Sequence, residues 1–309
     1  MKVCITGGAG YIGHYCLLRL SQIDQVRHVV CLSRKKRPIN LPISAGSVQW
    51  IEGDVMKPHS LEKAFLGCDV VVHLAGLMPF SPTVSEAEFD ACNHQGTINV
   101  IEACKKMNVP KVILASTYAV YGSPRNRIEA SVSEQTVPNP DSPYSRSKLK
   151  SENELCASGL SYYVLRLSHV YGVGAGIGDP GGVLMKFVGS AIKSCKIVLS
   201  GDVLVSRDYI YLHDVVTVLV QAILDISPSK KKLNVSSGKP VTLYDVAKNL
   251  QRIISDLYGR KINLEIVSQT AHAERIMVIE NRQLFELVSD LNLTSFEDGL
   301  KQLIRYQNP

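Results

Sequence analysis

The chain begins with a short apolar strand that runs directly into a glycine-rich turn. Residues 3–6 are mostly apolar, Gly7, Gly10 and Gly13 follow, and a helical pattern starts at Ile12. Glycines at this spacing permit a tight turn, close approach of the backbone to a ligand and close helix–strand packing. The start of such a helix also offers free backbone N–H groups to an anion. The turn therefore predicts an α/β fold that binds the pyrophosphate of a dinucleotide.

Apolar runs and helical patterns alternate through the first half of the chain. Near-continuous Val, Ile and Leu runs are typical of strands in a parallel sheet that is covered on both faces. Helical patterns between them predict right-handed βαβ units in a doubly wound sheet. The expected strands are residues 3–6, 29–32, 48–52, 70–74 and 112–116, and the expected helices are 12–22, 61–66, 86–106 and 144–157.

The second half of the chain has a less regular pattern. Thr242 and Asp245 have the spacing of a capping box and predict a helix that ends at Tyr258. Thr294 and Glu297 repeat this signal before a final helix. Two further strands are expected at 163–167 and 209–212, with loops at 172–182, 227–232 and 236–240.

These elements predict a doubly wound parallel Rossmann sheet with a smaller C-terminal lobe. Residues 1–165 are expected to form the dinucleotide-binding domain, which regains a strand and a helix near 207–225. Residues 166–309 are expected to form mainly a substrate-binding lobe.

Composition narrows the class of protein. The formal net charge of +6 suits a phosphate-bearing small molecule and does not predict nucleic-acid binding. The eight cysteines contain no Cys-x-x-Cys pair and lie mostly in apolar segments, so reduced core thiols are expected rather than a metal site or disulfides. The longest apolar run, 215–224, is too short to span a bilayer, and no secretory signal is recognised. A cytoplasmic protein without a membrane partner is expected.

Ser33 and Arg34 occupy the end of the second expected strand. An acidic residue at this point favours NAD, because its carboxylate accepts hydrogen bonds from the ribose hydroxyls. Ser33 removes a charge that would repel a 2′-phosphate, and Arg34 can hold such a phosphate bidentately. NADP is therefore slightly favoured over NAD. The alternative is that residues 34–37 form an exposed basic loop and the preference is loose.

Other residues near the carboxyl ends of the strands are expected to line the cofactor. Asp54 is a candidate partner of the adenine amino group, and Gly76 allows the cofactor to lie close to the backbone. Asn93 is expected either to face solvent or to fix its helix against the sheet and hold a water. The predicted cofactor-binding residues are Gly7, Gly10, Tyr11, Ile12, Gly13, Ser33, Arg34, Asp54, Val55, Leu74, Ala75, Gly76, Asn93, Ser116, Tyr144 and Lys148.

Tyr144 and Lys148 are predicted to act together in proton transfer. They lie four residues apart in an expected helix and therefore share one face, about one turn apart. A lysine cation favours the phenolate and lowers the pKa of a tyrosine from about 10 towards neutrality. Thr117 ends the fifth strand, where its hydroxyl can donate to a substrate oxygen. The predicted catalytic residues are Thr117, Tyr144 and Lys148.

With these residues in place, the chain resembles the extended short-chain dehydrogenases/reductases of the nucleotide-sugar epimerase/dehydratase branch. The resemblance covers nearly the whole chain and implies that Tyr144 is the acid/base, Lys148 its partner on the nicotinamide ribose and Thr117 a hydroxyl donor. It also implies that Arg207 contacts a substrate diphosphate, and that a homodimer forms through the helices at 86–106 and 144–157. The supporting motifs are Thr6-Gly-Gly-Ala-Gly-Tyr-Ile-Gly13, Gly53-Asp-Val55, His73-Leu-Ala-Gly76, Ser116-Thr-Tyr-Ala-Val-Tyr-Gly122, Pro143-Tyr-Ser-Arg-Ser-Lys148, Leu165-Arg-Leu-Ser-His-Val-Tyr-Gly172, Arg207-Asp-Tyr-Ile-Tyr-Leu-His-Asp214 and Asn234-Val-Ser-Ser-Gly238.

The chain departs from the pattern of that branch at its substrate end. Tyr118 and Ala119 stand where dehydratases carry an Asp-Glu pair, so 4,6-dehydration is not expected. His169 replaces a substrate-facing Asn. The late Arg-Pro-Gly-Asp segment is replaced around 270–273, with Arg275 as the candidate substitute for its arginine. The predicted substrate-binding residues are Thr117, Tyr118, His169, Arg207 and Arg275.

Three functions are consistent with these residues. The first is an NAD(P)-dependent nucleotide-sugar epimerase, acting at C4 of a UDP-type hexose through a transient keto intermediate. The second is an NADPH-dependent ketoreductase of a keto nucleotide sugar or smaller carbonyl compound, which Ser33, Arg34 and the replaced diphosphate arginine favour. The third is a non-catalytic cofactor-binding protein, which has no need of the three catalytic residues.

Overall fold

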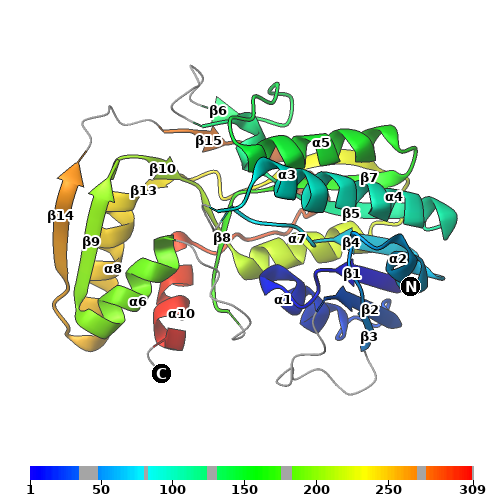
Figure 1. The fold of residues 1–309 in the computed structure, drawn as a ribbon. Coiled ribbons are helices and arrows are strands. Elements are labelled where there is room, and N and C mark those ends of the chain that lie inside the picture. Colours follow the sequence, from blue (N-terminus) through cyan, green and yellow to red (C-terminus); the bar gives the residue numbers. More distant parts are fainter. Residues whose placement is uncertain (35–47, 80–82, 124–130, 175–182, 270–275, 308–309) are drawn as a thin grey trace.

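The computed structural model describes residues 1–34, 48–79, 83–123, 131–174, 183–269 and 276–307. A larger lobe built on a parallel sheet contains the N-terminus, and a smaller lobe beside it contains the last helix (Figure 1). The predicted substitute arginine, Arg275, and the segment 270–273 lie outside the described residues, as does most of the loop at 172–182.

The larger lobe contains a central sheet with helices on both faces. Its sheet strands are β1 (Lys2–Thr6), β2 (His28–Ser33), β3 (Val48–Glu52), β4 (Val70–His73), β5 (Lys111–Thr117), β7 (Ser161–Leu167) and β12 (Lys230–Val235). Its helices are α1 (Tyr11–Leu20), α2 (Pro58–Phe65), α3 (Glu86–Phe89), the π-helical η1 (Asp90–Gln95), α4 (Gly96–Lys106), the 3-10 helix η2 (Tyr118–Tyr121), α5 (Pro143–Ala157), α7 (Leu212–Leu224) and α9 (Arg282–Leu287).

The smaller lobe and the segments that connect it to the sheet contain the remaining elements. The lobe itself is built from α6 (Val183–Ser194), β9 (Lys196–Gly201), α8 (Leu243–Tyr258), β14 (Asn263–Gln269) and α10 (Phe296–Gln307). The connecting strands are β6 (Ser131–Val132), β8 (His169–Tyr171), β10 (Ser206–Arg207), β11 (Tyr209–Tyr211), β13 (Val241–Thr242) and β15 (Val278–Ile279).

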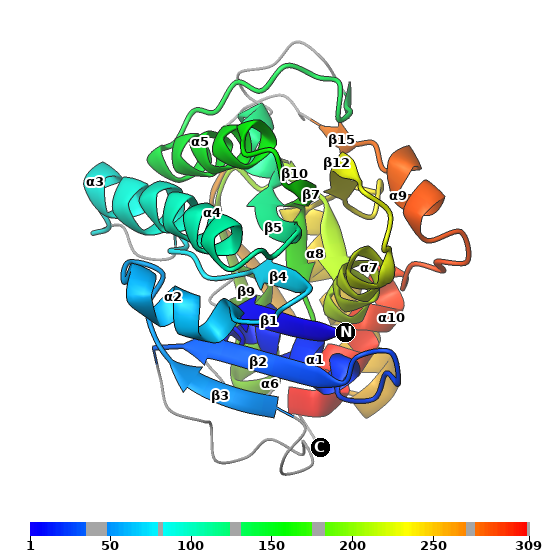
Figure 2. The same ribbon diagram turned by 90° about the vertical axis from the view of Figure 1, so that its right-hand side faces the viewer.

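The central sheet has seven parallel strands in the order β12-β7-β5-β4-β1-β2-β3 (Figure 2). The predicted doubly wound fold is therefore confirmed. The strand order reverses beside β1, because the chain first adds β2 and β3 on one side and then β4 and β5 on the other. Thr6 pairs with Leu32 on one side and with His73 on the other. Ligands of open α/β sheets bind at such a switch point, which here lies at the glycine turn.

The second half of the chain contributes β12 to the sheet, and the predicted loop at 227–232 is therefore wrong for its last three residues. Lys230 pairs with Tyr162 in β7, and the register continues to Val235. The strand escapes recognition because Lys230, Lys231 and Lys232 occupy its first half and only its second half is buried. The predicted strand at 209–212 forms as β11 but pairs with β8, outside the central sheet.

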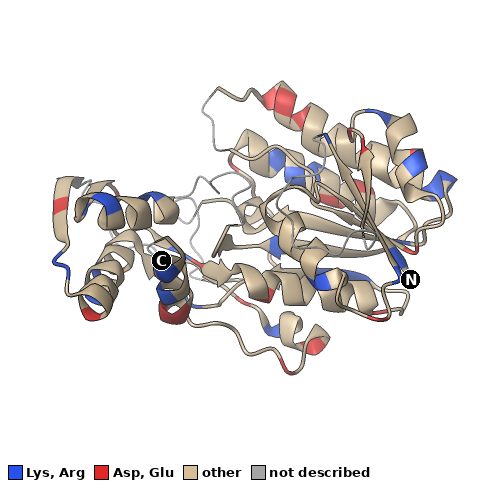
Figure 3. Cartoon of the chain, turned by 90° about the horizontal axis from the view of Figure 1, so that it is seen from below, with Lys and Arg blue, Asp and Glu red and all other residues tan. Residues whose placement is uncertain are grey.

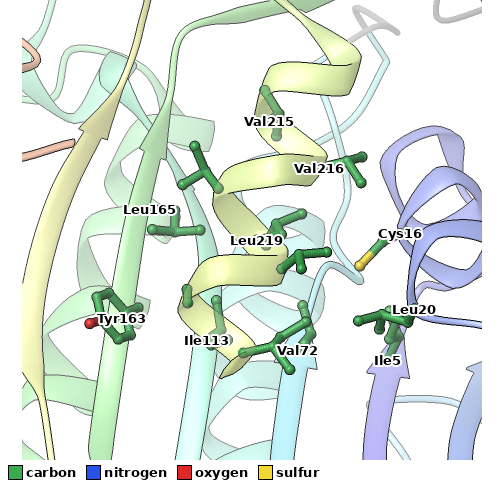
Figure 4. Packing of buried hydrophobic residues seen from close by; sticks show 14 of the residues in the cluster. Ile5, Cys16, Leu20, Val72, Ile113, Tyr163, Leu165, Val215, Val216 and Leu219 are labelled. Carbon is green, nitrogen blue, oxygen red and sulfur yellow. The ribbon is translucent and has the colours of Figure 1, made fainter. Parts of the chain in front are cut away.

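Apolar residues at helical spacing hold α7 against one face of the sheet. Figure 4 shows Val215, Val216 and Leu219 of α7 beside sheet residues Ile113 and Leu165, with α1 close by. On the opposite face, α2, α4 and α5 contribute a second buried cluster. Helices cover both faces of the central sheet, which explains why its inner strands are continuous apolar runs in the sequence.

The predicted helix start at Thr242 is confirmed. Thr242 Oγ1 accepts a hydrogen bond from the backbone N of Asp245 at 3.0 Å and donates one to Asp245 Oδ2 at 2.6 Å. The second predicted cap is shifted by one residue, because Ser295 accepts from the backbone N of Asp298 at 3.1 Å. Thr294 instead donates to the Asp214 carboxylate at 3.0 Å, which ties the start of α10 to α7.

The outer surface carries both signs of charge on both lobes, as expected for a modest net charge (Figure 3). All eight cysteines are free thiols. Among the described residues, no helix combines the length and the apolar character needed to cross a membrane.

Candidate active site

The glycine turn forms a tight cradle at the carboxyl end of β1. Gly7 has a φ of 72°, and a Cβ there would lie 2.7 Å from the backbone N of Ala75. A Cβ at Gly13 would lie 2.5 Å from the carbonyl O of Gly7, so neither position tolerates a side chain. Helix α1 follows with Gly10 as its N-cap, without a side-chain cap or an acidic residue in its first turn. Its first N–H groups therefore remain available to an anion, and the cradle fits a dinucleotide pyrophosphate.

His73 is a packing residue at the floor of this cradle. Its Nδ1 lies 2.7 Å from Thr6 Oγ1 and its Nε2 lies 3.2 Å from Thr97 Oγ1. Burial, together with the charge of Lys148, lowers the pKa of His73 to about 3. The imidazole is therefore neutral and joins β4 to β1 and α4, which excludes it as an acid/base near neutral pH.

Asn93 organises the loop that follows β4. It is 2% exposed and lies in the π-helical segment η1. Its Oδ1 accepts from the backbone N of Leu77 at 2.7 Å, and its Nδ2 donates to Leu77 O at 3.1 Å and to Ser147 Oγ at 3.1 Å. Asn93 thus fixes its helix against this loop and α5 rather than against the sheet. A π-helical turn that orients an inward-facing residue is common at functional sites.

Ser33, Arg34 and Asp54 are the residues predicted to contact the adenosine half of the cofactor. Ser33 ends β2 and is half-buried, and Arg34 follows it in an exposed position. Asp54 Oδ1 accepts from the backbone N of Met56 at 3.0 Å. The sequence did not single out Cys92, whose thiol lies within electrostatic reach of Arg34, Asp54 and Lys148. The sequence signal that could have indicated Cys92 is that it directly precedes the predicted cofactor-binding residue Asn93.

The three predicted catalytic residues come together at the carboxyl edge of the sheet. Thr117, Tyr144 and Lys148 are 7%, 8% and 6% exposed. A capping box between Ser142 and Ser145 starts α5 just before Tyr144. The ring of Phe89 packs edge-on against the Tyr144 ring at 5.8 Å, and the Tyr144 hydroxyl donates to Met78 Sδ at 3.5 Å. The Thr117 hydroxyl lies close enough to lower the pKa of Tyr144.

The predicted effect of Lys148 on Tyr144 is wrong for the protein alone. Burial raises the pKa of Tyr144 to about 12, and the group that acts to lower it is the Thr117 hydroxyl, not Lys148. Burial also lowers the pKa of Lys148 to about 8, against opposing contributions from Glu152 and Cys92. Spacing in a helix predicts that the two side chains share a face, but not how strongly burial acts on each.

Lys148→Met is expected to stabilise the fold at neutral pH. The pKa of Lys148 falls from 10.5 to about 8 on folding, so the folded state binds this proton less well than the unfolded chain. The wild-type protein therefore gains stability as pH rises from about 8 to about 10.5, and at pH 7 the buried cation costs about 3 kcal/mol at most. Urea unfolding at pH 7 and pH 10 measures this. The advantage of the variant should shrink at pH 10, and an equal advantage at both pH values would contradict the prediction.

The predicted substrate-binding residues Tyr118, His169 and Arg207 lie close together. Tyr118 Oη lies 3.2 Å from His169 Nε2, and the two rings lie 5.0 Å apart between centroids. His169 Nδ1 lies 3.3 Å from the backbone O of Asp208. Arg207, half-buried in β10, lies within electrostatic reach of both rings. The structure thus brings Tyr118, His169 and Arg207 together beside Tyr144.

A buried ion pair behind the predicted catalytic residues was not predicted from the sequence. Glu152 and Arg166 are 0% and 1% exposed, and Arg166 Nη2 lies 2.7 Å from Glu152 Oε2. Ser116 Oγ donates to the same carboxylate. Glu152 lies one turn after Lys148 in α5, and Ser116 directly precedes Thr117. The pair therefore connects α5 and β5, the two elements that carry the predicted catalytic residues.

Comparisons with known proteins agree with this fold. The model of the NAD dependent epimerase/dehydratase family matches residues 3–236. A putative UDP-glucose 4-epimerase of Methanocaldococcus jannaschii is 29% identical over 263 residues, which are 80% of this chain and 81% of that protein. The solved structure of MoeE5 in complex with UDP-glucuronic acid and NAD has a TM-score of 0.84 at 26% identity, covering 100% of this chain and 99% of that one. The UDP-glucose 4-epimerase of Thermotoga maritima shares the fold, with a TM-score of 0.85 at 24% identity, covering 100% of this chain and 99% of that one.

Proposed function

The chain belongs to the NAD dependent epimerase/dehydratase family, a family of enzymes, and on that premise we propose that it is a nucleotide-sugar 4-epimerase acting on a UDP-linked hexose. The observation that carries the proposal is the convergence of the buried Thr117, Tyr144 and Lys148 side chains at the carboxyl edge of the sheet that also carries the glycine cradle. The relative from Methanocaldococcus jannaschii is a putative UDP-glucose 4-epimerase, and MoeE5 has been solved with a UDP-sugar and NAD.

Each residue of the triad has a proposed role. A bound nicotinamide dinucleotide supplies the hydride acceptor and donor. The Tyr144 oxygen removes the proton of the C4 hydroxyl while the carbon loses its hydride, and it returns a proton when the hydride comes back to the opposite face. The Thr117 hydroxyl holds the C4 oxygen in place. Lys148 binds the nicotinamide ribose, one helical turn after Tyr144.

Dehydration is disfavoured by the residues beside Thr117. Elimination of water needs an acid and a base, and the pair at this place here is Tyr118 and Ala119. Alanine cannot transfer a proton, and burial raises the pKa of Tyr118 further above its ordinary value. A net ketoreductase is the second candidate, because Ser33 and the exposed Arg34 favour NADPH over NADH. NADPH suits a reductase, which must release its oxidised cofactor after each turnover, better than an epimerase that retains it.

The direct test is incubation of the purified protein with UDP-glucose, UDP-galactose and their N-acetyl derivatives, each with NAD and with NADP. Interconversion of at least one pair without net change in cofactor absorbance is the expected result. Absence of interconversion in every pair would refute the epimerase. Stoichiometric oxidation of NADPH with a 4-keto sugar nucleotide would establish the reductase instead.

Arg34→Ala is expected to weaken NADP binding by about tenfold or more while NAD binding changes little. The physical reason is that only NADP carries the 2′-phosphate with which an arginine at this position can form charge-assisted hydrogen bonds. Calorimetric titration of both dinucleotides measures the effect. Ser33→Asp is the matched reversal, because it places a repelling carboxylate at the same site. Equal weakening of NAD and NADP by Arg34→Ala would contradict the assignment.

We also propose the domain division and assembly expected from the sequence. Residues 1–165 would bind the dinucleotide and residues 166–309 mainly the substrate. Of the strand and helix expected to return to the sheet near 207–225, α7 does so, but the returning strand is β12 at Lys230–Val235. A homodimer would form through the face of the helices at 86–106 (α3, η1 and α4) and of α5. Two exposed ion pairs across this helix layer, Arg146 with Glu86 and Lys150 with Asp90, would then lie at or beside the interface.

A further inference from the structure

Tyr118 and His169 lie just beyond the carboxyl ends of neighbouring strands. Thr117 of β5 is in register with Leu167 of β7, and Tyr118 and His169 follow these two residues. Both side chains are half-buried at this edge of the sheet. The Tyr118 hydroxyl lies within electrostatic reach of the Tyr144 hydroxyl, which places it beside the proposed acid/base.

The direction of the hydrogen bond between the two side chains follows from the other partner of His169. Nδ1 faces the backbone carbonyl O of Asp208 at 3.3 Å, and a carbonyl oxygen can only accept. Nδ1 therefore carries the proton, and in a neutral imidazole Nε2 then has the free lone pair. The Tyr118 hydroxyl must donate to Nε2, at 3.2 Å. Its one proton is committed, and its oxygen is left as an acceptor.

The pair is neutral in the range where the enzyme would work. Burial, reinforced by the Arg207 charge, lowers the pKa of His169 to about 4. Burial raises the pKa of Tyr118, and of the other groups that face it, Arg207 lowers this pKa while Tyr209, Tyr144 and Asp208 raise it. Neither side chain has a pKa near neutrality, so the pair is suited to hydrogen bonding with a ligand rather than to acid/base chemistry.

The surroundings hold His169 in this orientation. The Tyr209 ring packs on its far side at 5.4 Å and itself stacks on Phe296 at 5.3 Å. Asp208, whose carbonyl orients the imidazole, is fixed through its carboxylate, which accepts from Ser237 N at 2.8 Å and from Ser237 Oγ at 3.0 Å. Reversal of the hydrogen bond would require His169 to give up its Asp208 partner.

We propose that Tyr118 and His169 form one specificity element, which presents the Tyr118 oxygen as a hydrogen-bond acceptor to the sugar ring. The inference rests on the proposed function, because it assumes a sugar beside Tyr144. A sugar hydroxyl or an acetamido N–H can donate to this oxygen, whereas an ionised carboxylate has no proton to give. The element therefore selects neutral hexoses and N-acetylhexosamines against hexuronates.

Two variants separate this role from a structural one. In His169→Phe the Tyr118 proton is released and can meet a carboxylate, so kcat/KM for UDP-glucuronate relative to UDP-glucose should rise about tenfold. In Tyr118→Phe the acceptor is lost, so KM for UDP-glucose should rise about fivefold with kcat little changed. The double variant should behave like Tyr118→Phe alone, because residues that act as one element are not additive.

Nitrogen-15 NMR of the histidine side chains tests the hydrogen-bond direction without a substrate. His169 should be the Nδ1–H tautomer and remain neutral down to about pH 5, with an assignment made from the His169→Phe spectrum. An Nε2–H tautomer, titration near pH 6.5, or additive kinetic effects of the two variants would overturn the inference. Failure of the wild-type protein to convert any sugar nucleotide would instead contradict the proposed function, whereas the tautomer tests the direction of the hydrogen bond independently of any substrate.

Discussion

Tyr144→Phe is expected to lower kcat by about 10²- to 10⁴-fold, the range typical for loss of a general acid/base. The change removes one oxygen, while the ring keeps its edge-on contact with Phe89. Cofactor binding and thermal stability should therefore stay close to those of the wild-type protein. Steady-state kinetics with the best sugar nucleotide, together with a titration of NAD, measures both properties on the same preparation.

Tyr162→Phe is the matched control for this change. Tyr162 is also 8% exposed, but it lies in β7 within the cluster that α2, α4 and α5 cover. It loses the same oxygen away from the catalytic residues and should retain wild-type kcat. If Tyr144→Phe kept more than a tenth of the wild-type kcat, the proton would have to come from another group, and both catalytic proposals would fail. Full biological activity of Tyr144→Phe would favour the non-catalytic alternative.

The sequence predicts the fold best where local pattern and tertiary role coincide. Strands β1, β2, β4 and β5 are buried along most of their length, so their apolar runs are visible without knowledge of their neighbours. β12 is different because it lies at the edge of the sheet, where Lys230 and Lys231 are exposed. An edge strand needs little apolar sequence, and charged residues there even protect it from unwanted pairing. Local pattern alone therefore interprets it as a loop.

The same distinction applies to the site. Gly7 and Gly13, or Tyr144 and Lys148, are close in sequence, and turn or helix geometry predicts their relation. Asn93 contacts Leu77 and Ser147, which are 16 and 54 residues away. Such contacts depend on how helices pack, which no local spacing encodes. The pKa of Tyr144 was misjudged for a similar reason, since burial is a property of the assembled site.

The ion pair between Glu152 and Arg166 connects the catalytic side chains to distant parts of the chain. Arg166 donates to both oxygens of Glu152, and its Nη1 donates to Tyr121 Oη at 2.9 Å. Tyr121 donates in turn to Asn234 Oδ1 at 2.7 Å, in β12. The network thus joins α5, β7, η2 and β12 through groups that have no access to water. Its charges are stable only as a pair, because a single buried ion carries a large desolvation penalty.

Arg166→Met is accordingly expected to lower the free energy of unfolding by about 3–5 kcal/mol, because it leaves the Glu152 carboxylate buried without its cation. The double variant Glu152→Gln/Arg166→Met should recover most of that loss, since it removes both charges and keeps an amide oxygen that can accept from Ser116. Urea unfolding of the three proteins at one pH measures the difference. Lys106→Met is the control. The Lys106 side chain is 62% exposed, so its ion pair with Glu62 should contribute less than about 1 kcal/mol to the free energy of unfolding. If the double variant were no more stable than Arg166→Met alone, the loss would come from packing rather than from the unpaired charge.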